Sequence, residues 1–324
     1  MSAQKVSIII PVRQVGRYLL EALEYLEKID WPDYEIIVVA DRALKNFSWP
    51  KVRLIASGQT GPAQKRDLGA KHAKGEILAF LDDDAYPNPD WLKKAVKHFE
   101  DKRVSAVGGP GVTPPNANFW EQSSGWVSAS PLGAGLYTYR FLPGKAQKID
   151  DYPSMNLLVR KSDFVQIGGF DSHYYPGEDT KLCLDLINLG KQIIYEPEAL
   201  VYHHRRSLWL PHLKQNGNFG LHRGFFAKRL PQTSAKLIFF MPSGLAAAVL
   251  VFLCQGFGWP LLKSLSQLAL MLYTALLVVN GIWIGLSSKS LAQALIALPA
   301  VFLTHFWYGL RFIQGFCFVK KLKQ

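Results

Sequence analysis

The sequence predicts an α/β domain with a mostly parallel, doubly wound sheet, followed by a basic and apolar helical region. Two observations predict this division. Short apolar runs of strand length alternate with helical segments over the first half of the chain, as in a parallel sheet with helical connections. All 25 acidic residues lie within residues 1–198, whereas residues 199–324 carry 13 of the 37 Lys and Arg residues and three long uncharged stretches.

The strands are predicted from uninterrupted apolar runs, because a strand buried on both faces has little polar alternation. They are Val6–Val12, Glu35–Ala40, Val52–Ala56, Ile77–Leu81, Asn156–Val159, Gln192–Tyr195 and Leu200–His203. Four helices are predicted between them, the first from the apolar face that it forms with four leucines. They are Gly16–Ile29, Gln59–Lys74, Pro89–Phe99 and Thr180–Leu189. Residues 125–144 are rich in glycine and aromatic residues and have no clear periodicity.

Three carboxylates, Asp82, Asp83 and Asp84, directly follow the buried run Ile77–Leu81. Open α/β sheets bind their ligands at such strand ends. Along an extended segment Asp82 and Asp84 point the same way, and two such carboxylates suit a hard divalent cation that keeps sites for phosphate oxygens. The alternative is a solvated acidic turn.

Five segments stand in an order and at separations that resemble glycosyltransferase family 2, whose GT-A fold enzymes transfer a sugar from a nucleotide-sugar with inversion. They are the first strand with Pro11-Val12-Arg13, GPAQKRDLGAKHAKGEILAFLDDD, NLLVRKSDFVQIGGFD, GEDTKLCLDLINLG and EPEALVYH. This resemblance covers residues 5–204, and the later segments VYHHRRSLWLPHLKQNGNFGLHRG and HFWYGLRFIQG resemble the membrane-bound exopolysaccharide-synthesis branch of the family. It implies a GT-A catalytic domain at 1–204, a basic interfacial segment at 205–236, and a membrane domain at 237–324 with about three embedded helices.

The resemblance also implies a metal and donor site. Asp84 would hold Mg²⁺ or Mn²⁺ with Asp82, and His203 would complete the metal site, with His204 or a merely packed histidine as alternatives. The implied nucleotide contacts come from Pro11, Val12, Arg13, Asp41, Arg66, Asp82 and Asp83.

Two departures from the family pattern concern this donor site. Ala40-Asp41-Arg42-Ala43 replaces the usual Asp-Asp-Gly-Ser, which leaves the base open, and Asp67 replaces the usual Asn. Lys65 and Arg66 have an alternative role as solvated helix charges.

The pair Glu178-Asp179 matches the acidic motif of the family near the acceptor. Inversion requires the acceptor hydroxyl to lose its proton as it attacks opposite the leaving group. Asp179 is the predicted base and Glu178 is predicted to orient the acceptor, while a simple helix-capping role for Asp179 is the alternative. Asn156 and Gly109 are predicted to line the sugar side.

The segment 205–236 interleaves Lys and Arg with aromatic residues, as expected for contact with an anionic leaflet. Arg205, Arg206 and Arg223 are predicted to hold a lipid-linked acceptor, with anchoring alone as the alternative. The QxxRW motif of processive synthases is absent at Gln215, so one or a few sugars per acceptor are expected.

Three stretches of residues 237–310 are long enough to cross a bilayer, for which about 20 residues suffice. They are Leu237–Leu262, Ser264–Ser288 and Ser290–Leu310. Basic residues before the first stretch and after the last favour the same cytoplasmic side, which requires an even number of crossings. The first stretch, which contains Pro242, is predicted not to span.

These features predict a metal-dependent inverting glycosyltransferase, multi-pass in the plasma (inner) membrane, with its catalytic domain on the cytoplasmic face. A UDP-sugar is the favoured donor and a polyprenyl-diphosphate-linked saccharide the expected acceptor, in cell-surface polysaccharide synthesis. Anionic lipids are expected partners and nucleic acid is not. The alternatives are a polyprenyl-phosphate glycosyl synthase and, more distantly, a nucleotidyltransferase, whose glycine-rich basic loop is missing after the first strand.

Overall fold

The computed structural model describes residues 4–44 and 46–322. Residues 1–3, 45 and 323–324, which fall in the predicted catalytic and membrane domains, lie outside the described residues. The chain divides into two compact units, and each is described by itself. One comprises Met1–Val112 and Leu142–His204, and the other comprises Thr113–Phe141 and Arg205–Lys323.

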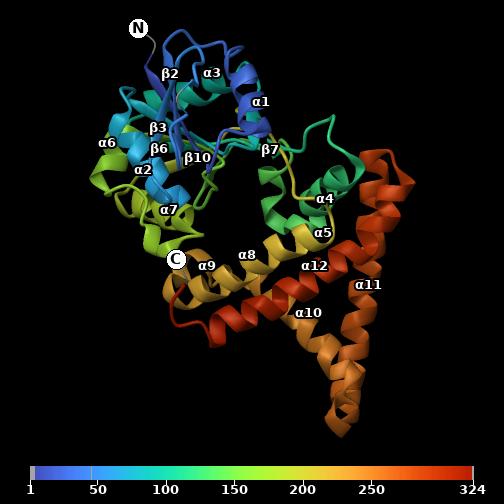
Figure 1. The fold of residues 1–324 in the computed structure, drawn as a ribbon. Helices are drawn as coiled ribbons and strands as arrows, with labels where there is room; N and C mark the ends of the chain where they lie inside the picture. The colour runs from blue at the N-terminus through green and yellow to red at the C-terminus, as the bar shows by residue number, and fades with distance from the viewer. Residues whose placement is uncertain (1–3, 45, 323–324) are drawn as a thin grey trace. The chain divides into compact units, whose positions relative to one another are not determined.

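The first unit is built on a large, mostly parallel sheet (Figure 1). Among the described residues it has eight strands, which lie side by side in the order β3 (Val52–Ala56), β2 (Tyr34–Ala40), β1 (Val6–Pro11), β4 (Ile77–Leu81), β9 (Asn156–Arg160), β6 (Val104–Gly108), β10 (Gln192–Tyr195) and β8 (Gln147–Ile149). The strands β3, β2, β1 and β4 are mutually parallel, and β9 runs antiparallel between β4 and β6. β1 and β4 are buried along their whole length, which explains their nearly continuous apolar sequences.

The helices of this unit are α1 (Arg17–Leu26), α2 (Pro62–His72), α3 (Trp91–Val96), α6 (Lys161–Gln166) and α7 (Glu178–Asn188). α1 buries Leu19, Leu23 and Leu26, as their spacing predicted. The predicted strands are confirmed to within one residue at each end. α7 begins two residues before the predicted start, so Asp179 lies inside its first turn and Gly177 is the N-cap residue.

A second, smaller sheet in this unit was not predicted. Its strands lie in the order β5 (Ala85–Pro87), β11 (Val201–His203) and β7 (Gly111–Val112). β5 and β11 are antiparallel, and His203 is paired with Ala85. Because Ala85 follows Asp84 directly, this pairing sets His203 beside the acidic turn.

The second unit is helical. Its helices are α4 (Phe119–Ala129), α5 (Pro131–Ala134), α8 (Leu210–Arg229), α9 (Pro231–Ser234), α10 (Leu237–Leu253), α11 (Pro260–Ser288) and α12 (Leu291–Cys317). Its hydrophobic core includes Val127 of α4, Ile284 of α11 and Val301 of α12.

The segment 113–141 differs from the predicted domain organisation, which placed it in the catalytic domain. It belongs to the second unit, because buried polar contacts tie it to the C-terminal helices. The backbone N–H of Leu132 donates to Oδ1 of Asn280 at 2.9 Å, and Oγ of Ser124 lies 2.8 Å from Nδ1 of His212.

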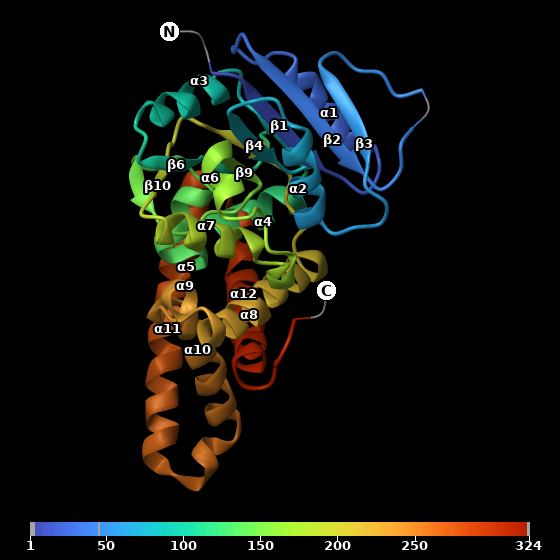
Figure 2. The ribbon, with the colours of Figure 1, turned by 90° about the vertical axis from the view of Figure 1, so that its left-hand side faces the viewer.

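Among the described residues, α11 and α12 are long and apolar enough to cross a membrane, and α10 is a shorter apolar helix of 17 residues. α11 begins at Pro260, so the predicted boundary at Lys263 falls inside it. Figure 2 shows α10 and α11 side by side, extending away from α8 and α12 of the same unit.

Candidate active site

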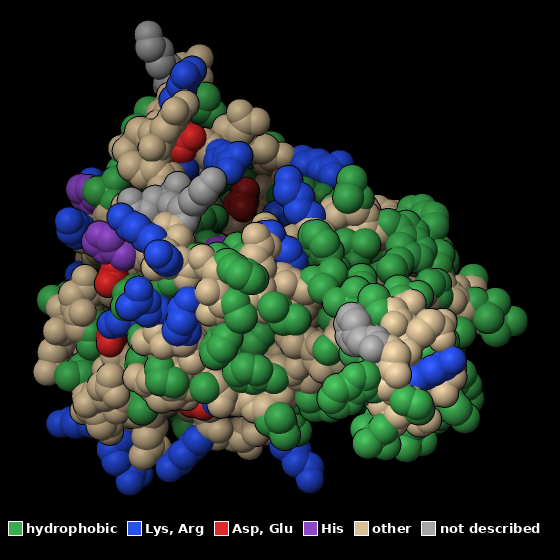
Figure 3. Space-filling model, turned by 90° about the horizontal axis from the view of Figure 1, so that it is seen from below, with side chains coloured by type: hydrophobic (Ala, Val, Ile, Leu, Met, Phe, Trp, Pro, Cys, Tyr) green, Lys and Arg blue, Asp and Glu red, His purple; other side chains and the backbone are tan. Residues whose placement is uncertain are grey.

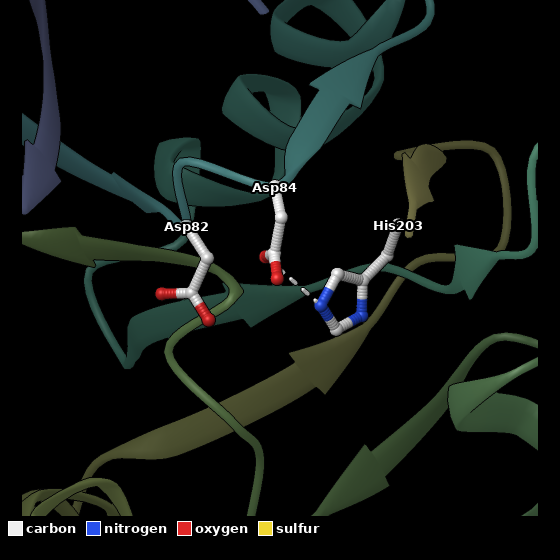
Figure 4. A group of neighbouring side chains, drawn as sticks. All are labelled: Asp82, Asp84 and His203. Atoms are coloured by element: carbon white, nitrogen blue, oxygen red, sulfur yellow. Dashed lines mark ion pairs between the residues drawn. The ribbon is translucent and has the colours of Figure 1, made fainter. Parts of the chain in front are cut away.

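The acidic turn after β4 meets a histidine from β11. Asp82, Asp84 and His203 each offer one ligand atom, and these three atoms lie within 4.8 Å of one another (Figure 4). Nε2 of His203 is 3.2 Å from Oδ1 of Asp84. Two carboxylate oxygens and one imidazole nitrogen form a donor set that fits a divalent cation.

The neighbouring His204 points elsewhere. Its Nε2 lies 2.9 Å from Oε2 of Glu21 on α1, and its ring packs against Tyr18 at 4.6 Å between centroids. Successive residues of an extended segment face opposite ways, which explains why the side chain of His204 turns away from Asp84, although its backbone N–H donates to the Asp84 carbonyl at 2.9 Å.

Arg66 of α2 joins the acidic turn to the start of α7. Its side chain is buried, with Nη2 2.7 Å from Oδ1 of Asp82 and Nη1 3.0 Å from Oε1 of Glu178. Burial lowers the pKa of this guanidinium, but Asp82 and Glu178 more than offset that effect and raise it. Arg66 is therefore an internal cation shared by two carboxylates, and its alternative role as a solvated helix charge is wrong.

Lys65, the preceding residue, is buried as well. Its Nζ donates to the Val12 carbonyl at 2.6 Å and forms an ion pair with Asp41. The backbone N–H of Asp41 donates to the carbonyl of Arg13 at 3.1 Å. The ends of β1 and β2, both predicted to contact the nucleotide, are thus held together by one buried lysine.

Asp179 directly follows Glu178 in the first turn of α7 and is half-buried. Its Oδ1 accepts from the backbone N–H of Thr180 at 2.8 Å, and the hydroxyl of Thr180 donates to Oδ1 of Asp151 at 3.0 Å. Burial, followed by the nearby charges of Glu178 and Asp151, raises the pKa of Asp179 to about 7. A carboxyl group with this pKa is suited to accept a proton near neutral pH.

Asp151 was not predicted as a site residue. It is almost fully buried, and it accepts a hydrogen bond from the hydroxyl of Thr180, the residue after the predicted base. The sole signal was two adjacent aspartates at 150 and 151 ahead of a short strand, which is an ordinary pattern for a loop.

Asn156 and Gly109, predicted on the sugar side, serve the core instead. The Asn156 side chain is 0% exposed, and its amide donates to the carbonyls of Gly109 at 2.7 Å and Ala199 at 2.8 Å. Its Oδ1 accepts from the indole N–H of Trp91 at 2.8 Å. With these contacts Asn156 holds the loop after β6 in place and has no surface left for a sugar, so this prediction is corrected.

The departure at Asp67 has a structural role. Its Oδ1 accepts from the backbone N–H of Phe170 at 2.9 Å, a bond that the usual Asn would also accept. Burial raises the pKa of Asp67 to about 6.

The remaining predicted residues lie in two places. Asp83 is half-buried in the turn between β4 and β5, and Pro11 ends β1. Arg205, Arg206 and Arg223, predicted to bind the acceptor, belong to the second unit. There the Arg205 guanidinium lies 5.0 Å from the ring centroid of Phe141, and that of Arg223 lies 4.7 Å from the centroid of Phe239.

Comparisons with known proteins all find similarity to glycosyltransferases. The family model described as "Glycosyl transferase family 2" matches residues 7–168. The pre-mycofactocin glycosyltransferase of Mycobacterium tuberculosis is 26% identical over 94% of this chain and 66% of the relative, so the chain spans slightly less than two thirds of that protein. A dolichyl N-acetyl-α-D-glucosaminyl phosphate 3-β-D-2,3-diacetamido-2,3-dideoxy-β-D-glucuronosyltransferase of Methanococcus voltae is 22% identical over 96% of each chain.

A solved structure shares the fold. The mannosyltransferase PcManGT of Pyrobaculum calidifontis, in complex with GDP-Man and Mn²⁺, superposes with a TM-score of 0.53 at 18% identity, over 93% of this chain and 87% of that one. The predicted GT-A fold is confirmed.

Proposed function

This chain belongs to glycosyltransferase family 2, and on that basis we propose that it is a metal-dependent, inverting enzyme that transfers a sugar from a nucleotide-sugar to a lipid-linked saccharide at a membrane. One observation carries the proposal. The buried guanidinium of Arg66 connects the cluster of Asp82, Asp84 and His203 to the carboxylate pair of Glu178 and Asp179. The donor-binding cluster and the candidate base therefore lie on either side of this one arginine.

Asp82, Asp84 and His203 would hold a divalent metal ion. A bound Mn²⁺ or Mg²⁺ supplies Lewis-acid neutralisation of the departing diphosphate. The histidine favours Mn²⁺, because imidazole nitrogen suits a transition metal better than it suits Mg²⁺. The structure from Pyrobaculum calidifontis is a complex with GDP-Man and Mn²⁺, which supports a donor of the nucleotide-sugar class.

At the other end of the site, Asp179 accepts the proton of the acceptor hydroxyl. The acceptor oxygen then bonds to the anomeric carbon as the bond from that carbon to the diphosphate breaks. The raised pKa of Asp179 supports this role. Glu178, held by Arg66, orients the acceptor. At the donor end, Asp41 and the end of β1 would contact the base and ribose, and a UDP-sugar is the favoured donor.

The acceptor proposal rests on the relatives and on charge. The name of the relative from Methanococcus voltae describes transfer to a sugar on dolichyl phosphate. In this chain, residues 199–324 carry 13 Lys or Arg residues and no acid, which suits a lipid-linked phosphate and an anionic leaflet. Arg205, Arg206 and Arg223 are the proposed contacts. The membrane location is the plasma membrane, with catalysis on its cytoplasmic face.

The test measures transfer of labelled sugar from a panel of nucleotide-sugars to a lipid-linked saccharide, using purified membranes and Mn²⁺. Asp179→Asn is expected to lower transfer by about 10²-fold or more while donor binding persists. Asp185→Asn is the matched control, because Asp185 lies in the same helix and pairs with Lys181. Full transfer by Asp179→Asn would favour a phosphate acceptor, which needs no base.

A further inference from the structure

We propose that α10 and α11 cross a lipid bilayer as a hairpin, while α12 lies along the membrane surface beside α8. This topology replaces the expectation from sequence that the first apolar stretch, which contains Pro242, does not span. This inference rests on the proposed membrane location. The hydrocarbon core of the bilayer covers the exposed apolar surface of the hairpin. The basic segment before α10 and the end of α12 then lie on the same side of the membrane.

Apolar side chains cover the outward faces of the hairpin. Leu253 at the end of α10 is 66% exposed, and Leu261 and Met271 of α11 are each 70% exposed. Figure 3 views the molecule from the end toward which the hairpin points in Figure 1, and hydrophobic side chains gather on the right-hand part of that face. Extended apolar surfaces of this kind mark contact with a membrane or another protein.

The hairpin has the length of two crossings. α10 has 17 residues, about 25 Å of helix, and the uncharged stretch continues through the turn to Lys263. α11 has 29 residues, about 43 Å of helix. The hydrocarbon core of a bilayer is about 30 Å thick, so each leg, with the turn included, can reach across it.

The turn between α10 and α11 carries residues typical of a membrane–water interface. Gln255 and Trp259 lie in this turn, and Lys263 lies in the first turn of α11. Trp259 is 68% exposed. Indole rings favour the headgroup level, and lysine can extend its ammonium group to the surface. These residues therefore suit the point where the hairpin emerges on the far side.

The second half of α12 runs beside α8. Nε2 of His212 lies 3.0 Å from Oγ1 of Thr304. Further along, a Cβ on Gly220 would lie 2.5 Å from the carbonyl oxygen of Tyr308, so the two backbones are in close contact. From Thr304 to its end, α12 must therefore lie at the same depth in the membrane as α8.

α8 is too charged to cross. Its 20 residues include Lys214, Arg223, Lys228 and Arg229, and charged side chains inside a bilayer are costly. Lys228 donates to the carbonyl of Phe316 at 2.9 Å, which keeps the end of α12 against a cationic side chain. The part of α12 that is not beside α8, residues 291–303, spans only about 20 Å. α12 is thus placed at the surface, although its composition alone would allow a crossing.

Two native cysteines distinguish the possible topologies. Cys254, just after α10, and Cys317, at the end of α12, are exposed, whereas Cys183 is buried. If only α10 and α11 cross, Cys254 and Cys317 face opposite sides. If all three helices cross, or if α11 and α12 cross without α10, both cysteines face the same side. Position 289, between α11 and α12, faces the side of Cys317 only if α12 does not cross.

The test labels single-cysteine variants in sealed vesicles of each orientation with a membrane-impermeant maleimide. One variant keeps Cys254, one keeps Cys317, and one carries Lys289→Cys after the native cysteines are replaced by Ala or Ser. The cysteine-free chain gives the background, and detergent gives the total. We expect Cys254 to be labelled from the side opposite to Cys317 and to position 289.

Labelling of Cys254 and Cys317 from the same side would overturn the proposal. So would shielding of Cys254 from both sides until detergent is added, because the hairpin would then end inside the bilayer. If the cysteine-free chain does not accumulate, mass analysis of labelled peptides from the wild-type chain gives the same answer. Release of the whole chain from vesicles by alkaline carbonate would contradict the proposed membrane location, whereas wrong-sided cysteines in a retained chain contradict only this topology.

Discussion

Nη2 of Arg66 lies 2.7 Å from Oδ1 of Asp82, so a buried cation holds the first carboxylate of the acidic turn. The same guanidinium lies 3.0 Å from Oε1 of Glu178. The two carboxylates come from segments far apart in the chain, and each would be costly to bury without a partner. Arg66 therefore couples the donor end of the site to the acceptor end.

Arg66→Lys is expected to lower transfer by about 10²-fold, because an ammonium group lacks the planar fork that bonds two carboxylates at once. Donor affinity and turnover should both fall, which the affinity for UDP with Mn²⁺ and the rate of transfer will measure. Arg53→Lys on β3 is the matched control, since Arg53 is exposed. Unchanged transfer by Arg66→Lys would show that the bridge is only structural.

The pH dependence follows from the raised pKa of Asp179, which is about 7. A general base acts when deprotonated, so kcat/KM should fall about tenfold per pH unit below pH 7 and level off above it. Asp151→Asn removes one of the charges that raise this pKa, so the fall of kcat/KM on the acid side of the pH profile (the acid limb) should move to lower pH. Asp150→Asn is the control. An acid limb that does not move in Asp151→Asn would contradict the role given to Asp151.

Much of the large sheet can be predicted from sequence, because strands buried on both faces read as apolar runs and their ends are marked by polar residues. β5 cannot be predicted in this way. Ala85–Pro87 is short and contains Pro87, and it becomes a strand only by pairing with β11 more than a hundred residues later. The approach of His203 to Asp84 depends on that pairing, so local pattern alone left His204 as an alternative.

The segment 113–141 shows a second limit of local pattern. α4 is helical although it contains Gly125, and several of its polar side chains are buried. Ser124 and its partner His212 are one example. Periodicity detects an apolar face, and it does not detect a helix that packs through polar contacts. The misplaced sugar contact at Asn156 has a similar origin, because burial of a polar side chain cannot be read from its type.

His203→Ala should lower the affinity for Mn²⁺ by at least about tenfold, because even the loss of a residue that only supports a metal ligand typically lowers metal affinity by that factor. His204→Ala is the matched control, because His204 bonds Glu21 on α1. Titration with Mn²⁺, followed by its paramagnetic resonance signal, measures the affinity of each variant. Equal affinities in His203→Ala and the wild-type chain would remove His203 from the metal site.

Asp67→Asn should stabilise the chain above pH 6. The folded state raises the pKa of Asp67 to about 6, so folding loses stability as pH rises from about 4 to 6 and the charge forms. Asn avoids this cost, which is about 1–2 kcal/mol once solvent screening of a half-buried group is allowed for. Thermal midpoints of both proteins at pH 7.5 and pH 4.5 measure the effect. A variant that is less stable at pH 7.5 would contradict it.

The most direct measurement of the central claim is transfer of labelled sugar from nucleotide-sugars into lipid-linked product by membranes that carry wild-type chain or Asp84→Asn. The wild-type chain should label the lipid fraction from at least one donor when Mn²⁺ is present and lose this activity in chelator. Asp84→Asn, which lacks one charged oxygen of the cluster, should show no transfer under either condition. Equal transfer by Asp84→Asn and the wild-type chain would contradict a metal-dependent glycosyltransferase site at this turn.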